Sequence, residues 1–395
     1  MPNFINVIER DLRYGGGHEH TLLRSLANTA PEVSFRFLTS RSGDPDKMDQ
    51  SSLCLPILTN SKQQKSDLST ALAADAECLS RFIRTKNADG LCKFLIPSAD
   101  PYYIRLCLLL LRTIKHRARF SLRILYEGAI SALSKDETSQ LKAEINAKNV
   151  ELLTETPSLS RRLVQAYQIS VEAILLLPCA LMPDDKVKFD RACNGTQVQH
   201  FKIGYLGGLR TEKGQDQLPK IVTQLAMRLK ERNPDFSASV LYQTHRKRRL
   251  RVRNLRFDLK MLKASISAWR QGNPVKLVKL EATLSEAQFK EILQTVDLLL
   301  IPYNLDAYAH RGSGLIIDGV LAQKPIVATR GLGMADLLAF GSALDAASAS
   351  EFAEKIIQLM QNYDQFKQHT GLARKAVLQQ LTASQDYLQH FASAD

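Results

Sequence analysis

The sequence predicts an α/β protein built from two doubly wound, mostly parallel sheets. Short apolar runs alternate with helical stretches through both halves of the chain, which is typical of parallel strands joined by crossover helices. The 395 residues exceed one ordinary core and suit two domains of roughly 150 to 200 residues each. Residues 178–199 break the pattern with Pro, Asp, Lys, Asn and Gly, so we place the domain boundary near residue 195.

The N-terminal half begins with an apolar strand at residues 4–8 and a glycine loop before an amphipathic helix at 19–27. Further strands are predicted at 33–38, 93–96, 122–126, 150–153 and 173–177. Glycines after a first strand let the backbone approach a ligand closely. We therefore predict that Gly16 and Gly17 contact a ligand and that His18 is a candidate catalytic residue. A purely structural loop is the alternative, because the dinucleotide-binding glycine pattern is not met.

The C-terminal half repeats the alternation. Strands are predicted at residues 201–206, 237–242, 275–278, 296–301 and 326–329, with a helix in 281–293 that Ser285 caps. From residue 350 onward the pattern predicts helices at 352–360, 363–379 and 384–391. Ligands of open α/β sheets bind beyond the carboxyl ends of the strands, so we expect a site at those ends, in a cleft between the two domains.

Residues 296–330 carry the strongest functional signal. An apolar run suited to a strand buried on both faces ends at Pro302, and Gly312-Ser313-Gly314 then opens an apolar helix. Free N–H groups and the positive end of the helix dipole favour an anion there, so we predict that these three residues bind phosphate. The alternative is an ordinary helix start with Ser313 as its cap. Asp318 lies within the apolar run of this helix, which indicates that it faces a polar cleft.

The order of these features resembles the donor site of GT-B glycosyltransferases, most closely family 4: a loop, a small-residue helix start, an acidic residue and a Gly-Lys-Pro-Val-like turn. Asp318 matches the second acid of the family's Glu-x7-Glu motif, and the resemblance implies that it holds the ribose of a nucleotide sugar. His310 stands where the first acid is expected, and Gln323 stands where a glycine precedes Lys324-Pro325. His310 is predicted to bond donor hydroxyls in place of the missing acid; a plain loop residue is the alternative.

The loop after strand 201–206 resembles the same family through its sequence Gly207-Gly208-Leu209-Arg210-Thr211-Glu212-Lys213-Gly214. The resemblance implies that Lys213 reaches the diphosphate. Gly208, predicted to line the donor site, occupies the place of the family's usual arginine. Arg210 or Arg311 is therefore predicted to supply the second cation. Positive side chains and helix amides aimed at a leaving diphosphate lower the barrier, and this chemistry needs no metal.

The resemblance implies the GT-B architecture of two Rossmann-like doubly wound domains facing a central cleft. Residues 1–195 would form the acceptor side, 196–380 would bind the nucleotide sugar, and 381–395 would return to the N-terminal domain. Glu127 is the candidate general base if the sugar is inverted, because that mechanism must remove the proton of the nucleophile. If the configuration is retained, the leaving diphosphate takes that proton. A strand-end acid in a turn is the structural alternative for Glu127.

The chain carries a net charge of +13, and the excess gathers in two clusters, residues 105–123 and 246–256. A charge run is most often a solvated face, and docking onto anionic lipid headgroups is the second interpretation. Nucleic acid ranks last, because aromatics are not interleaved and no nucleic-acid module is recognisable. Without a secretory signal or an apolar run of about 20 residues, we expect a cytoplasmic protein, peripheral at the inner face of the membrane if these clusters bind lipid.

The leading hypothesis is a glycosyltransferase that moves a sugar from a UDP- or GDP-sugar to the hydroxyl of a glycan or lipid-linked acceptor, in the assembly of bacterial surface polysaccharide or glycolipid. The donor is a substrate, and neither a cofactor nor a metal is expected. Two alternatives stay open. One is a nucleotide-sugar epimerase of the same fold, and the other is a catalytically silent nucleotide-sugar-binding or scaffold protein, which the missing first acid suggests.

Overall fold

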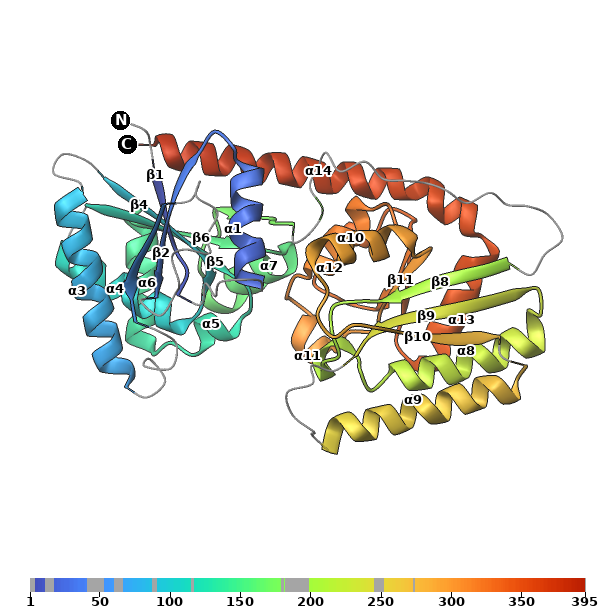
Figure 1. Ribbon diagram of the computed structural model, residues 1–395. Coiled ribbons are helices and arrows are strands. Elements are labelled where there is room, and N and C mark those ends of the chain that lie inside the picture. The colour runs from blue at the N-terminus through green and yellow to red at the C-terminus, as the bar shows by residue number, and fades with distance from the viewer. Residues whose placement is uncertain are drawn as a thin grey trace. The chain divides into compact units, whose positions relative to one another are not determined.

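The computed structural model describes residues 4–10, 18–40, 53–59, 67–86, 91–114, 117–178, 181, 199–244, 252–272 and 274–394 (Figure 1). For residues 18–23, 53, 54, 86, 252 and 253 it describes the backbone alone. The chain divides into two compact units. The N-terminal unit comprises Met1–Cys179, His310–Gly312 and Gln379–Asp395, and the C-terminal unit comprises Ala180–Ala309 and Ser313–Leu378.

The N-terminal unit contains a parallel sheet of seven strands in the order β3-β2-β1-β4-β5-β6-β7. The strands are β1 (Phe4–Ile8), β2 (Ser34–Ser40), β3 (Leu53–Leu58), β4 (Cys92–Ala99), β5 (Ala118–Ile124), β6 (Val150–Thr154) and β7 (Ala173–Ile174). The chain runs outward from β1 in one direction and resumes at β4 on the other side. The strand order therefore reverses between β1 and β4, which is the point where doubly wound sheets bind ligands.

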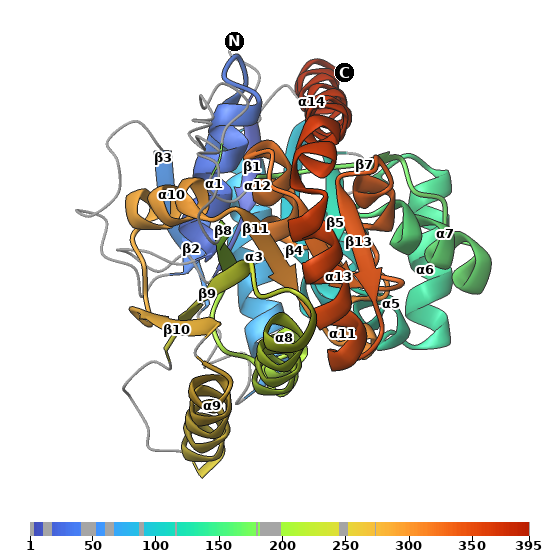
Figure 2. The ribbon, with the colours of Figure 1, turned by 90° about the vertical axis from the view of Figure 1, so that its right-hand side faces the viewer.

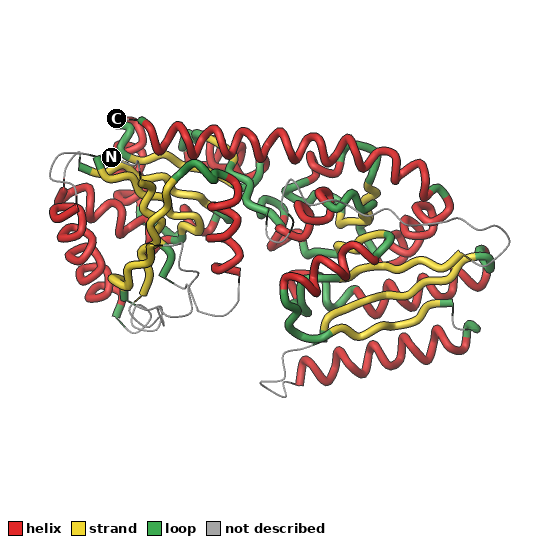
Figure 3. The backbone as a smooth tube through the Cα atoms, turned by 45° about the horizontal axis from the view of Figure 1, so that its top comes forward, coloured by secondary structure: helices red, strands yellow, loops and turns green. Residues whose placement is uncertain are grey.

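Helices cover both faces of this sheet (Figure 3). They are α1 (His18–Thr29), α3 (Leu68–Lys86), α4 (Pro101–Ile114), α5 (Gly128–Ser131), α6 (Lys135–Asn146), α7 (Pro157–Tyr167) and the end of α14 (Tyr363–Ser393). Side chains alternate along the strands, so Phe94 and Phe120 pack with α3, α4 and α6 on one face, their ring centroids 5.0 Å apart. Leu95 and Val7 pack with α1 and α14 on the other face.

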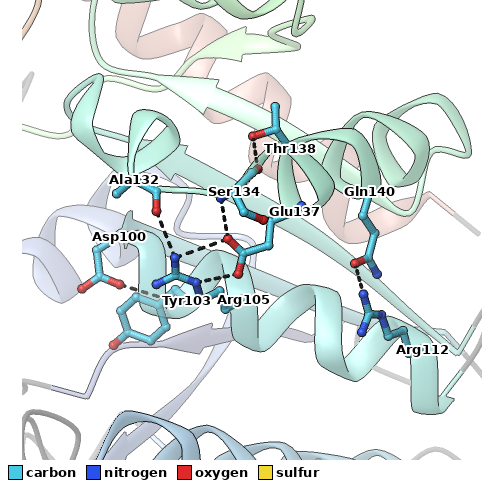
Figure 4. A network of polar contacts seen from close by, with 9 residues as sticks. All are labelled: Asp100, Tyr103, Arg105, Arg112, Ala132, Ser134, Glu137, Thr138 and Gln140. Carbon is cyan, nitrogen blue, oxygen red and sulfur yellow. Dashed lines mark hydrogen bonds and ion pairs between the residues drawn. The ribbon is translucent and has the colours of Figure 1, made fainter.

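Three of the five arginines at residues 105–123 contact neighbours within the N-terminal unit, and Figure 4 shows two of them, Arg105 and Arg112. Arg105 Nε lies 2.7 Å from Glu137 Oε1, and Arg112 donates to Gln140 Oε1 at 2.5 Å. The buried Arg123 donates to two backbone carbonyl oxygens at 2.9 and 3.2 Å. Arg117 is exposed, and Lys115 and His116 lie outside the described residues. The contact of this cluster with anionic lipid stays a prediction.

The C-terminal unit contains a parallel sheet of six strands in the order β10-β9-β8-β11-β12-β13. The strands are β8 (Gln199–Tyr205), β9 (Phe236–Gln243), β10 (Val275–Leu280), β11 (Leu298–Ile301), β12 (Ile326–Thr329) and β13 (Ala343–Ala346). Counted from β8, this is the Rossmann order 3-2-1-4-5-6, and it reverses between β8 and β11. The predicted fold class, two Rossmann-like doubly wound domains, is confirmed.

Two helical layers flank the second sheet (Figures 1 and 2). The helices are α8 (Leu218–Arg232), α9 (Val252–Arg270), α10 (Glu286–Thr295), α11 (Leu305–Tyr308), α12 (Gly314–Leu321) and α13 (Ala349–Gln361). Leu298 and Leu300 share a core with α8, α9 and α13, whereas Leu299 between them contacts Gly319 of α12 on the opposite face. Ser285 caps α10 with a full capping box, as predicted from the sequence.

Two strands lie outside the predicted set, and both are edges of their sheets. β3 contains Pro56, which removes a backbone donor and fits only an edge strand. β13 has the sequence ALDA, and three of its four residues are not fully buried, so it lacks the apolar run that marked the central strands. Edge strands are exposed on one side, and their weaker hydrophobic pattern explains both omissions.

The last 31 residues of secondary structure form one helix, α14, so the predicted separation of 363–379 from 384–391 is wrong. Residues 380–383 contain no glycine or proline to end it. The hydroxyl of Ser384 donates to Gln380 O at 2.9 Å and accepts the N–H of Leu176 at 2.9 Å, so this serine is satisfied inside a helix. Leu388 and Phe391 then lie in the core of the N-terminal unit.

No helix in the described part of the chain is both long and apolar enough to cross a bilayer.

Candidate functional site

The loop after β8 starts with two glycines in left-handed backbone conformation. Gly207 and Gly208 have φ values of 95° and 78°, a region that glycine enters without steric cost. Gln243, at the end of β9, accepts both of their N–H groups with Oε1, at 2.9 and 2.6 Å. A side chain from the neighbouring strand therefore fixes the course of the loop beside the point where the strand order reverses.

Lys213 ends the short 3-10 turn η2 (Thr211–Lys213), and its ammonium lies against this loop. A Cβ atom placed on Gly207 would be 2.6 Å from Lys213 Nζ. The ring centroid of Tyr303, two residues beyond β11, is 5.5 Å from the same nitrogen. Tyr205 donates to the carbonyl oxygen of Lys213 at 3.0 Å, and burial raises the pKa of Tyr205, which keeps it a donor. A positive charge is thus fixed at the carboxyl edge of the sheet.

Gly214 connects this loop to the end of β11. Its φ is 77°, and a Cβ atom there would collide with the carbonyl oxygen of Pro302. No other residue fits this conformation without moving the backbone. The glycine after Lys213 therefore brings the lysine loop against the loop that follows β11.

The start of α12 lies in the same place. Ser313 is its N-cap, and among the described residues its side chain makes no capping bond; instead Oγ donates to Tyr303 Oη at 3.4 Å. The Ser313 N–H points at Met334 Sδ, 3.2 Å away, and sulfur is a weak acceptor. A Cβ at Gly207 would be 3.9 Å from Leu315 Cδ2 in the first turn. Tyr303 and Gly207 thus each lie between Lys213 and the positive end of this helix.

Asp318 is 1% exposed in the second turn of α12. Its Oδ1 accepts the N–H of Leu181 at 3.2 Å. A buried carboxylate needs such partners, and any ribose hydroxyl would join or replace this bond. The predicted ribose contact stays a prediction.

Arg210 lies at the N-cap of η2, and its side chain points toward Glu212. Its Nε is 3.3 Å from Glu212 Oε1, and half of its side chain is exposed. Exposed ion pairs of this kind are weak, so the guanidinium is available to an anion at small cost. Its predicted role as the second cation stays a prediction.

His310, Arg311 and Gly312 group with the N-terminal unit. His310 Nδ1 lies 2.7 Å from Ser158 Oγ, and its carbonyl oxygen accepts from Thr156 Oγ1 at 2.6 Å. A Cβ on Gly312 would collide with the carboxylate of Glu155, which explains the need for glycine there. His310, Arg311 and Gly312 therefore make their contacts in the N-terminal unit, whereas Ser313 and Gly314, which follow directly in sequence, make theirs in the C-terminal unit.

Glu127 lies at the N-cap position of α5, after β5. It accepts from Arg162 Nε at 3.0 Å and from the hydroxyl of Tyr167 at 3.0 Å. The hydrogen bond from Arg162, with smaller contributions from Tyr167 and His310, lowers the pKa of Glu127. The carboxylate is anionic at neutral pH but a weaker base than an unpaired glutamate. To act as the general base predicted from the sequence, Glu127 would have to lose its hydrogen bond from Arg162.

Where the strand order of the N-terminal sheet reverses, the residues after β1 and β4 meet. Arg10 NH2 lies 2.6 Å from Asp100 Oδ2, and the Arg10 guanidinium lies over the ring of Tyr103 at 4.7 Å. The sequence prediction did not include these residues; their signal was a charged residue within two positions of the end of each of two central strands. Gly16 and Gly17 lie outside the described residues, and only the backbone of His18 is described, at the start of α1.

No metal-binding group of three or more His, Cys, Asp or Glu side chains occurs within the described residues.

By sequence, no family model and no curated protein matches the chain. By structure, it is similar to a glycosyltransferase from Rickettsia africae, with 13% identity, a TM-score of 0.67 and full coverage of both chains. Anabaena HepE, solved with UDP and glucose, matches with 12% identity, a TM-score of 0.64 and full coverage of both chains. WaaG, a glycosyltransferase involved in lipopolysaccharide biosynthesis, matches with 14% identity and a TM-score of 0.60 over 99% of this chain and 100% of its own.

The chain has the GT-B glycosyltransferase fold. The C-terminal unit brings Lys213, the glycine loop and the start of α12 together. Their contacts with a nucleotide sugar stay predictions. Two side chains that arrange them, Gln243 and Tyr303, were missed from the sequence. Each of these two side chains contacts a residue that is distant in sequence; Gln243, for example, is 35 residues from Gly208, whose N–H it accepts. A polar residue at the end of a predicted strand was the only available signal.

Proposed function

We propose that this protein is a glycosyltransferase that moves a sugar from a nucleotide-diphosphate donor to a hydroxyl acceptor. One observation carries the proposal: the Lys213 ammonium and the start of α12 both lie beside Gly207 and Tyr303, where the strand order of the C-terminal sheet reverses. A phosphate placed there would meet a cation and the positive end of a helix dipole at once. We therefore propose that residues 196–380 bind the donor and that residues 1–195 form the acceptor side.

In the proposed reaction the diphosphate leaves as the glycosidic bond breaks. Lys213, aided by Arg210 or Arg311, and the first-turn amides of α12 stabilise the charge that develops on it. This arrangement performs the task of a metal ion, so we propose that the reaction is metal-independent. Asp318 is proposed to hold the ribose and His310 the donor hydroxyls. Glu127 is proposed as the base of an inverting reaction; in a retaining reaction the diphosphate accepts the proton.

The nucleotide and the acceptor are proposed from the structural neighbours. HepE was solved with UDP and glucose, which supports a UDP-sugar as the first donor to test, with GDP-sugars next. WaaG is involved in lipopolysaccharide biosynthesis, which supports a glycolipid or surface-polysaccharide acceptor. We propose that the enzyme meets such an acceptor in the cytoplasm, at the inner face of the membrane.

The test is calorimetric titration of UDP, GDP and their glucose conjugates into the wild type, Lys213→Ala and Lys220→Ala. Lys220 is an exposed lysine of α8 and serves as the matched control. Loss of a charge-assisted hydrogen bond costs about 1.5 to 3 kcal/mol, so Lys213→Ala should weaken nucleotide binding by roughly tenfold or more. Lys220→Ala should bind as the wild type does.

Three outcomes would redirect the proposal. Absence of binding by every nucleotide would remove the donor site. Binding without release of nucleoside diphosphate or sugar transfer, even with glycolipid acceptors, would favour the silent binding protein. Recovery of an epimerised sugar in the absence of any acceptor would favour the epimerase.

A further inference from the structure

Helix α9 exposes a continuous apolar stripe to solvent. Its five members are Leu255 (59% exposed), Leu259 (49%), Leu262 (56%), Ile266 (42%) and Trp269 (72%). Eleven large apolar side chains are exposed among the described residues, and the other six lie at six different places in the fold. Single exposed apolar residues are ordinary, whereas a contiguous set on one element marks a surface that meets a partner.

The stripe does not belong to the core of its unit. Residues 257, 261, 264 and 268 form the inner face of α9 and pack against α8 and the sheet. At about 100° per residue, the five exposed residues fall within an arc of about 80° on the opposite side. The helix therefore has two apolar faces, and folding uses only one of them.

A basic flank runs beside the stripe. Arg256, Lys260, Lys263 and Arg270 are exposed along one side of it, whereas Asp258 is the sole acidic residue of α9. On the same helical projection the four cations lie about 60° to 140° from Leu255, between the stripe and the buried face. An apolar face bordered by lysine and arginine is typical of helices that lie in the plane of a membrane surface.

We propose that the outer face of α9 docks this protein onto an anionic lipid surface. The stripe enters the boundary between headgroups and acyl chains, and the four cations contact anionic headgroups beside it. Trp269, near the C-terminal end of the helix, has the side chain that membrane interfaces favour most, an amphipathic ring that sits at headgroup level. Nineteen residues of helix give a contact line about 28 Å long.

Charge decides between lipid and a second copy of the chain. Pairing two copies through this stripe would bring together ten cationic and two acidic residues, twice the five and one in the sequence of a single α9. Like charges at that density oppose association. An anionic bilayer instead complements the basic flank. Arg105, Arg112 and Arg123 contact neighbours within the N-terminal unit, whereas four exposed cations of α9 border an apolar stripe.

Trp269 is the only tryptophan of the chain, so the whole protein reports its own docking. The experiment titrates the intact protein with vesicles of phosphatidylcholine alone or with added phosphatidylglycerol, and follows Trp269 emission. We expect a blue shift with the anionic vesicles, reversed by high salt, and little change with the neutral ones. Because α9 carries no donor-site residue, this result is independent of nucleotide binding. No shift with anionic vesicles would overturn the proposal.

Matched variants separate the stripe and the flank from the rest of the surface. Leu262→Ser should weaken vesicle binding about tenfold, whereas Leu372→Ser, at an equally exposed leucine of α14 (55%), should leave it unchanged. Neutralising Lys260 and Lys263 to Gln should weaken binding about fivefold per charge, and Lys135→Gln on α6 should have no effect. Equal effects of test and control variants would overturn the proposal. So would a lipid-free dimer that Leu262→Ser dissociates, because it would assign the stripe to a second copy.

Discussion

At the scale of single residues, the candidate donor site depends on where one ammonium group lies. Lys213 Nζ occupies the space that a side chain at Gly207 would need, with 2.6 Å between that nitrogen and a hypothetical Cβ. The lysine supplies the charge, and the glycine supplies the room for it. The position of the charge can therefore be changed without removing it.

Gly207→Ala should displace the Lys213 ammonium and weaken UDP binding about tenfold, equivalent to about 1.4 kcal/mol. The positive φ of 95° should also lower the free energy of unfolding by about 1 kcal/mol. Gly272→Ala is the control, because its φ is 83° and no described atom lies within 4 Å of the added Cβ. Calorimetry and denaturant unfolding of both variants check the prediction. Equal UDP affinity in the two alanine variants would refute the role given to Gly207.

At the scale of elements, two lysines hold the turn between α12 and β12: Lys324 joins it to the end of α10, and Lys367 joins it to the start of α14. Gln323 has a φ of 51°, left-handed backbone at the position where the GT-B resemblance expects glycine. Lys324 Nζ donates to the carbonyl oxygens of Gln294 and Val296 at 2.7 and 2.8 Å, and Lys367 Nζ of α14 donates to Gln323 O at 2.8 Å. Burial lowers the pKa of each lysine to about 8, and the charge of Lys324 adds to the lowering at Lys367.

These lysines should make stability rise with pH. Because both pKa values are near 8 when folded and near 10.4 when unfolded, the unfolded chain holds more protons between these values. Their contribution is therefore full above the unfolded pKa and is lost as the pH falls through 8. From pH 7 to 9.5 the free energy of unfolding should increase on the order of 1 kcal/mol more in the wild type than in Lys324→Met. Denaturant titrations at both pH values measure this, with exposed Lys220→Met as control. A wild-type advantage that does not change with pH would contradict the pKa shifts.

At the scale of the whole molecule, the sequence predicted what depends on local pattern. Apolar runs marked the central strands, and glycines with Lys213 marked the loops at their carboxyl ends. Partners that meet only in the fold were missed, as with Gln243 on the amides of Gly207 and Gly208. The edge strands β3 and β13 lacked the pattern of buried strands. Arg105 and Arg112 of α4 both contact α6, whereas Arg123 of β5 bonds to buried backbone carbonyl oxygens, and the sequence did not show these partners.

The account rests on a diphosphate bound beside Lys213 and the first turn of α12, and a crystal structure with UDP tests that most directly. We expect phosphate oxygens at about 3 Å from Lys213 Nζ and from the N–H groups that open α12. A well-ordered UDP bound elsewhere on the protein, with neither group in contact, would contradict it.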